Sequence, residues 1–256
     1  MPPSSRKNWA SLSSTQRQTV INGFLKAKQS GAYDQLVMQH QQAMMGNPVT
    51  DWHQKPIFLP VHRWFLTRIE AITGVKIPYW DWSTQQSLPP GLGGDGDPNQ
   101  GYRVMTGPFA NWTVIIWNST TNTFVPRDQP GLIRQTGVYA SGLSNTDSVN
   151  WWVSVTPYDA SPWDTTVSAF REGVEGMHDG VHAWVGGDMR TGTSPNDPLF
   201  WLHHANIDRI WGGWQTRHGT TSYAAPAGQG PNDPMPNTGG TTPSQMFPIP
   251  AYDQLP

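Results

Sequence analysis

The histidines of this chain fall into two groups, and this distribution constrains the fold more than any other feature. Three of the eight histidines lie within residues 40–62 and four within residues 178–204, with none between the groups. Both groups coincide with segments in which apolar residues recur at the spacing of a helix. The pattern therefore predicts a helical core that brings distant histidines together.

Apolar periodicity predicts helices at residues 13–31, 32–45, 57–74, 167–187 and 197–218. Ser and Thr residues open the first segment as capping candidates, and Gly74 stands at the end of the third. In the last segment Asp197 suits the N-cap and Pro198 the first turn. We expect a mainly α protein whose core is a four-helix bundle with long irregular loops.

Glycine and proline are abundant, with 26 and 24 residues among 256. They predict a loop at residues 87–101 and a tail at residues 219–256, which we expect to wrap over the core or to be partly disordered. Residues 111–127 indicate a short β-hairpin, because apolar residues flank a polar turn. Length and the absence of repeats favour one domain over residues 1–256, with its core at about 12–218.

Charge and cysteine content exclude several classes of function. Charged residues make up 13% of the chain and the net charge is −2, so neither nucleic acid nor a membrane surface is an expected partner. The lack of cysteine excludes disulfides, thiolate metal sites and a cysteine nucleophile. No apolar run approaches the roughly 20 residues that span a bilayer, and the N-terminus does not resemble a signal peptide. We expect a soluble protein, either cytoplasmic or exported with a partner.

The spacing of the histidines suits metal binding. His178 and His182 lie four residues apart and would project from one face of a helix on successive turns, and His204 could join them from the next helix. The second set of three comprises His40, His53 and His62. Ligation by imidazole alone suits Cu, Zn, Fe or Ni. Copper is favoured, because carboxylates normally join the ligands of di-iron and di-zinc centres.

The adjacent histidines at positions 203 and 204 cannot both face one small target, because neighbours on a helix point about 100° apart. His204 shares an apolar stripe with Phe200 and Ile207, whereas Asn206 interrupts the stripe of His203. His204 is therefore the expected ligand, and His203 is expected beside the site or at the surface.

Four stretches carry distinctive motifs: DWHQKPIFLPVHRWFLTRIE, IPYWDWS, MHDGVHAWVGG and SPNDPLFWLHHANIDRIW. They resemble the two copper motifs and a structural signature of the type-3 copper proteins, and within them those of tyrosinases and catechol oxidases (polyphenol oxidases). In the second copper motif this family uses the second of two adjacent histidines, in agreement with His204. The lack of cysteine excludes the thioether link of many members, so the chain is more similar to bacterial tyrosinases than to fungal ones.

The resemblance implies two copper ions, each held by three imidazoles, that bind O2 between them. The implied ligands are His40, His53 and His62 for one ion, and His178, His182 and His204 for the other. The resemblance also implies that Phe200 packs near the copper pair and that the phenol ring stacks near His182. The small side chain of Ala183 would leave space over the substrate.

Two acidic residues bear on the reaction that the resemblance implies. Glu175 stands where family members carry a Glu that holds a water near the coppers and helps to deprotonate a monophenol. Asp179 stands where hydroxylating members commonly carry Asn; aspartate adds a negative charge and lacks the amide donor. The implied activity is oxidation of o-diphenols to o-quinones together with ortho-hydroxylation of monophenols, and Asp179 puts the second step in question.

Other functions stay open. A catechol oxidase or an o-aminophenol oxidase would lack monophenol hydroxylation. A hemocyanin-like oxygen carrier would use the same copper pair, but carriers bury it beneath further domains. A zinc hydrolase or a structural metal-binding bundle is disfavoured, since no His-Glu-x-x-His motif is present. The expected partners are a phenolic substrate, O2 and a copper-delivery or escort protein.

Overall fold

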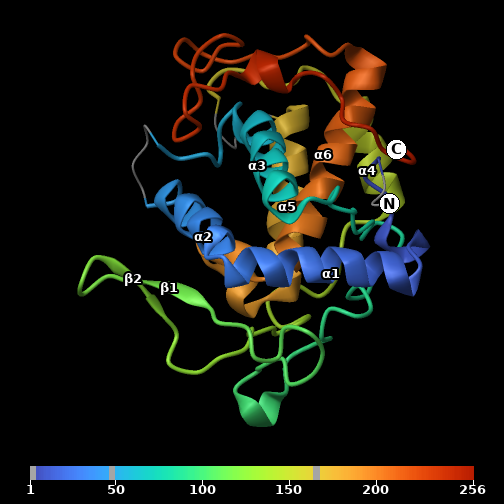
Figure 1. Cartoon of the computed structure of the whole chain (residues 1–256). Coiled ribbons are helices and arrows are strands. Elements are labelled where there is room, and N and C mark those ends of the chain that lie inside the picture. The colour runs from blue at the N-terminus through green and yellow to red at the C-terminus, as the bar shows by residue number, and fades with distance from the viewer. Residues whose placement is uncertain (1–3, 46–49, 164–167) are drawn as a thin grey trace.

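The computed structural model of the protein describes residues 4–45, 50–163 and 168–256. These residues form six α-helices and one two-stranded sheet (Figure 1). The helices are α1 (Ser14–Gln29), α2 (Ala32–Gln42), α3 (Phe58–Thr73), α4 (Thr146–Ser154), α5 (Phe170–Val185) and α6 (Leu199–His218), and the strands are β1 (Ile115–Asn118) and β2 (Thr123–Pro126). Short 3₁₀ helices occur at Trp9–Ser11, Pro98–Gln100, Gly187–Arg190, Ser194–Asn196 and Pro243–Met246.

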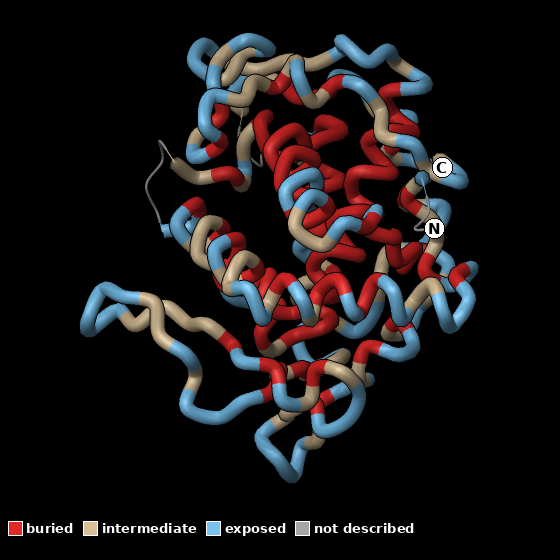
Figure 2. The backbone as a smooth tube through the Cα atoms, in the orientation of Figure 1, coloured by how far each residue is buried: buried red, intermediate tan, exposed pale blue. Residues whose placement is uncertain are grey.

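The core is a helical bundle centred on α6, which packs against α3, α4 and α5. Every residue of α6 from Leu199 to Gln215 is buried, so this helix is surrounded on all sides. Figure 2 shows the buried backbone concentrated in these central helices, while the peripheral loops are exposed. The expected mainly α fold with a helical-bundle core is confirmed.

The predicted helix ends agree with the structure to within about three residues. Ser13 and Gln16 form a capping box at the start of α1, and Gly74 ends α3 with a φ of 70°. The N-cap of α6 is Pro198, one residue after the predicted Asp197. The Asp197 carboxylate still accepts a hydrogen bond from the Leu199 backbone amide (2.9 Å), but it also forms a buried ion pair with Arg134.

The expected hairpin is present, and one helix was not expected. β1 and β2 pair antiparallel, with Trp117 opposite Phe124 and their rings 5.0 Å apart. Helix α4 begins after Asn145, whose side chain accepts a hydrogen bond from the Ser148 amide (2.9 Å). Its nine residues are too few to give a clear helical period, because only Val149 and Val153 are buried.

The tail lies over the core, one of the two arrangements expected for it (Figure 1). Arg63 in α3 donates to the carbonyl of Met246 (2.8 Å), and Gln215 in α6 donates to that of Phe247 (2.9 Å). Near its end the tail reaches the N-terminal segment, where the Arg6 amide donates to the carbonyl of Ala251 (2.8 Å).

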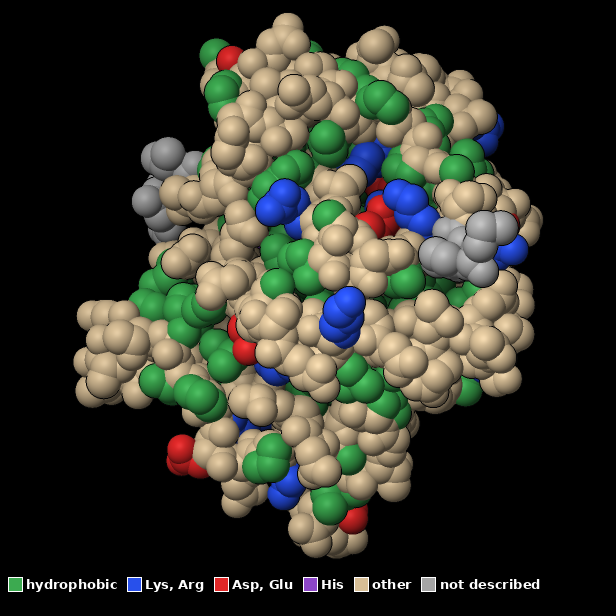
Figure 3. All heavy atoms as spheres, viewed as in Figure 1, with side chains coloured by type: hydrophobic (Ala, Val, Ile, Leu, Met, Phe, Trp, Pro, Cys, Tyr) green, Lys and Arg blue, Asp and Glu red, His purple; other side chains and the backbone are tan. Residues whose placement is uncertain are grey.

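The surface carries few charges. Figure 3 shows blue and red side chains scattered over this face without a large patch of one sign, as the low content of charged residues predicts. Among the described helices, none is both long enough and apolar enough to cross a membrane.

Candidate metal centre

The first histidine group joins two helices and the connection between them. His40 lies near the end of α2, His53 on the connection, and His62 in the second turn of α3. One ring nitrogen of each lies within 4.8 Å of the others. The ring centroids are 5.1–5.8 Å apart, so the three imidazoles converge on one point.

The second group joins α5 and α6. His178 and His182 lie on successive turns of α5, and both His203 and His204 come from α6. One ring nitrogen of each lies within 4.8 Å of the others. The Nε2 atoms of His178 and His204 are 3.2 Å apart, which indicates that both are directed at the same small volume.

Backbone carbonyls orient three of these rings. In each case Nδ1 must donate, because a carbonyl oxygen only accepts, and the free lone pair is therefore on Nε2. The acceptors are Gly192 for His40 (2.7 Å), Phe58 for His62 (2.8 Å) and Met189 for His182. The three Nε2 atoms are buried and have no hydrogen-bond partner among the described residues. This arrangement is typical of metal-ligating histidines, so the residues fit metal ions.

His203 has a different environment from the other buried histidines. Trp82 Nε1 donates a hydrogen bond to His203 Nδ1 (3.1 Å), so the proton of the neutral ring lies on Nε2. A protonated nitrogen has no lone pair for a metal ion. His203 is buried rather than at the surface.

The two groups face each other across a small gap. The rings of His62 and His204 stack at 4.4 Å with an interplanar angle of 14°. Two phenylalanine rings contact both groups: the centroid distances are 4.8 Å from Phe58 to His62, 4.9 Å from Phe58 to His178, 4.1 Å from Phe200 to His204 and 5.0 Å from Phe200 to His40. Phe200 and Phe58 thus both contact the two histidine groups.

Burial favours the neutral form of five of these imidazoles. Loss of solvation lowers the pKa of His40, His62, His178 and His204 well below the usual imidazole value. The same cause lowers the pKa of His182 to about 4. A neutral imidazole keeps the lone pair that a metal ion requires.

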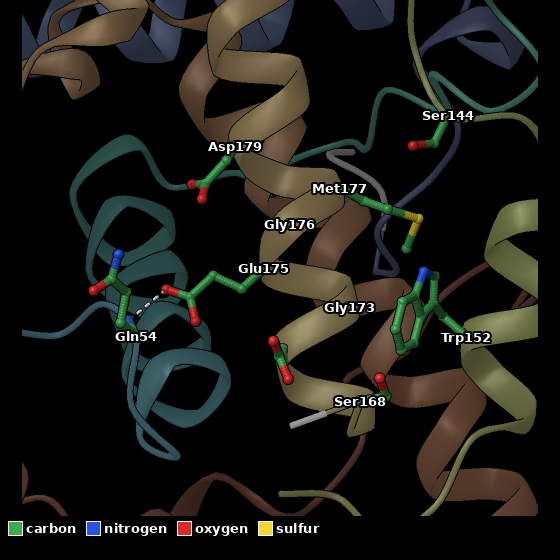
Figure 4. Close-up of a pocket in the computed structure, with 10 residues that line it drawn as sticks. Gln54, Ser144, Trp152, Ser168, Gly173, Glu175, Gly176, Met177 and Asp179 are labelled. Carbon is green, nitrogen blue, oxygen red and sulfur yellow. Dashed lines mark hydrogen bonds between the residues drawn. The ribbon is translucent and has the colours of Figure 1, made fainter. Parts of the chain in front are cut away.

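Glu175 is buried on α5, one turn before His178. Its Oε1 accepts a hydrogen bond from the Gln54 backbone amide (2.6 Å), and its Oε2 accepts one from Arg171 (3.0 Å). Gln54 follows His53 directly, so this hydrogen bond fixes the segment that contains His53 against α5 (Figure 4). Burial raises the pKa of Glu175 to about 7, although His53, the Gln54 amide and Arg171 all act in the opposite direction.

Asp179 and Ala183 lie close to the second group. Asp179 is largely exposed, and its Oδ1 accepts a hydrogen bond from His178 Nδ1 (3.0 Å). Asp179 also borders a cavity of about 130 Å³ that the histidines line, which we call the histidine cavity. Ala183 is half-buried on α5 beside His182, outside the residues that line this cavity.

Three residues at the site were missed in the sequence: Phe58, Trp82 and Arg171. Trp82 is part of IPYWDWS, a signature that marks a structural element without indicating its contact with His203. Arg171 is buried between Asp159 and Glu175. Its position one helical turn before Glu175 is the sequence feature that could have indicated this ion pair.

Comparison with known proteins identifies the family to which this chain belongs. The model of the family described as "Tyrosinase: Common central domain of tyrosinase" matches residues 30–217. The chain belongs to the tyrosinase family. Tyrosinases of Streptomyces antibioticus and Streptomyces glaucescens are 37% and 36% identical to it over 94% of this chain and 95% of their own length. The expected enzyme class is thereby confirmed.

Solved structures agree on the fold of this tyrosinase family member. A polyphenol oxidase variant from Thermothelomyces thermophila superposes with a TM-score of 0.66 at 24% identity, covering 98% of this chain and 88% of that chain. The matched family region contains both histidine groups, which could each hold a metal ion.

Proposed function

We propose that this tyrosinase family member is a type-3 copper phenol oxidase that oxidises o-diphenols to o-quinones and also hydroxylates monophenols at the ortho position. The observation that supports this most is the pair of facing imidazole groups, in which the Nε2 atoms of His40, His62 and His182 are buried and have no hydrogen-bond partner among the described residues. The proposed ligands are His40, His53 and His62 for one copper ion, and His178, His182 and His204 for the other.

The chain's own residues position and deprotonate the substrate in this proposal. The copper pair, when bound, supplies O2 binding and electron transfer. Phe58 and Phe200 exclude water from the space between the groups. Asp179 holds the ring of His178, and Glu175 is suited to take up the phenol proton, because a pKa of about 7 matches neutral pH.

We include the whole chain in one copper domain. Arg63, which follows His62 directly, and Gln215 in α6 both bind tail carbonyls, so the tail packs on the same helices that carry the histidines. Residues 1–256 would then form a single unit around the metal pair.

Oxygen uptake by copper-loaded protein tests the proposed function. With catechol we expect one O2 to be reduced to two waters for every two catechols oxidised to o-quinone. An oxygen carrier would instead release O2 unchanged, and that result would overturn the proposal. Initial rates with tyrosine, dihydroxyphenylalanine and o-aminophenol then compare the three candidate activities directly.

Replacing Asp179 by asparagine tests the role of the charge at that position. Hydroxylation requires a phenolate, and a carboxylate beside the site raises the free energy of that anion, whereas asparagine keeps the acceptor for His178 without the charge. We expect Asp179→Asn to raise the ratio of monophenol to diphenol rates by about three- to tenfold. An unchanged ratio at unchanged copper content would show that this charge is irrelevant to hydroxylation.

A further inference from the structure

A groove crosses the outward face of α5 beside the metal centre (Figure 4). Its volume is about 480 Å³, and we call it the α5 groove. Gly173 and Gly176 place the helix backbone at its floor. Figure 4 shows Gln54, Glu175 and Asp179 on one side of the helix and Trp152 and Met177 on the other. One wall is therefore polar and acidic, and the other carries the apolar Trp152 and Met177 side chains together with the Ser144 hydroxyl.

The α5 groove adjoins the histidine cavity, because Asp179 lines both. The histidine cavity, at about 130 Å³, is small compared with typical ligand pockets of roughly 300–1,000 Å³, whereas the α5 groove falls within that range. If the phenol ring of a substrate lies at the histidines, a longer substituent on that ring, which we call the arm, would extend past Asp179 and along α5.

The charges of the α5 groove favour a cation. Its carboxylates are Glu172, Glu175 and Asp179, and no Lys or Arg is among its described lining residues. Glu172 Oε2 is shielded from solvent and has no hydrogen-bond partner among the described residues. Trp152 lies on the other side of the helix, where its indole packs directly over Gly173, and the rest of the ring is an aromatic surface that a cation can contact. An ammonium group could contact both walls, whereas a carboxylate would be repelled.

The cation that borders the histidine cavity does not neutralise the α5 groove. Arg190 is among the residues that line the histidine cavity, but its guanidinium lies 3.8 Å from the centroid of the Tyr139 ring. Arg171, itself a residue of α5, forms ion pairs with Asp159 and Glu175. It therefore offsets the charge of Glu175 and leaves Glu172 and Asp179 as the carboxylates available to a cation.

We propose that the α5 groove binds the arm of an extended phenolic substrate and selects arms that end in a protonated amine. This proposal rests on the proposed function for the reaction at the ring. It assigns Glu172 and Trp152 to binding of the substrate arm.

Two glycines of α5 provide a matched pair of variants. A Cβ added at Gly176 or at Gly180 meets no atom within 4 Å, and leucine is a good helix former, so both replacements are compatible with the fold. Only Gly176 lines the α5 groove. We expect Gly176→Leu to lower the ratio of kcat/KM for dopamine to that for catechol by about tenfold, and Gly180→Leu to leave it within about twofold.

Dopamine and hydrocaffeate test which charge the α5 groove prefers. Both carry a catechol ring with a short arm, which ends in ammonium in dopamine and in carboxylate in hydrocaffeate. We expect wild-type kcat/KM to favour dopamine by about tenfold and Glu172→Gln to reduce this preference by about threefold. Equal values for the two substrates in the wild type would overturn the assignment of the arm.

Binding of phenethylamine gives a readout that is independent of turnover, since it lacks the phenol hydroxyl. Calorimetry on the copper-loaded full chain should show its dissociation constant rising by about tenfold in Gly176→Leu and not in Gly180→Leu. Equal binding to wild type and Gly176→Leu would overturn the groove proposal even if catechol is oxidised. Absence of catechol oxidation by the copper-loaded wild-type protein would instead contradict the proposed function.

Discussion

His204→Ala is expected to reduce the copper content from two ions per chain to one and to abolish catechol oxidation. His204 Nε2 lies 3.2 Å from His178 Nε2, so its loss removes one of the three proposed ligands of this ion. Mutation of a residue that hydrogen-bonds to a metal ligand typically lowers metal affinity or activity by about 10- to 100-fold. Removal of a ligand itself should therefore lower the rate by more than about a hundredfold. Metal analysis and oxygen uptake measure the two effects.

The neighbouring residue provides the control. His203→Gln keeps an acceptor for the Trp82 indole N–H, and it removes a ring whose proposed proton position leaves no lone pair for a metal. We expect this variant to retain two copper ions. Loss of one ion from His203→Gln, with both retained in His204→Ala, would reverse the proposed ligand assignment.

Asp208→Ala is expected to lower the free energy of unfolding by about 3–5 kcal/mol, the usual cost of leaving buried charges without a partner. Asp208 lies one turn after His204 and is buried. Its carboxylate accepts hydrogen bonds from Arg6 (2.6 Å), Arg63 and the Tyr252 hydroxyl (2.6 Å). The three donors come from the N-terminal segment, α3 and the tail, so one carboxylate joins distant parts of the chain. Urea denaturation followed by circular dichroism measures the change.

Lys76→Ala is the matched control for this measurement. Lys76 pairs with Glu70 at 2.9 Å but is about half exposed, and exposed ion pairs contribute about 0–1 kcal/mol. A loss of less than about 1 kcal/mol for Asp208→Ala, similar to that for Lys76→Ala, would contradict the role of Asp208.

The histidine groups could be predicted because their information is local. His178 and His182 lie one turn apart on a helix, and His204 lies on the apolar stripe of α6, so helical periodicity alone indicates which side chains share a face. The structure brings together both sets of three that the spacing indicated, and adds His203 to the second.

The remaining features depend on contacts between residues far apart in the sequence. The Trp82–His203 hydrogen bond spans 121 positions, and the Gln54–Glu175 bond also spans 121. Periodicity carries no information about such pairs, because each partner reads as an ordinary residue in its own segment. Asp197 illustrates the same limit, since its buried ion pair is formed with Arg134, 63 positions away, in addition to its hydrogen bond from the Leu199 amide.

The central claim is that each of the two facing imidazole groups holds one copper ion. Counting the copper retained by wild-type protein after loading and removal of loosely bound metal tests it most directly. We predict two ions per chain. A single retained ion per chain, or none, would contradict the account.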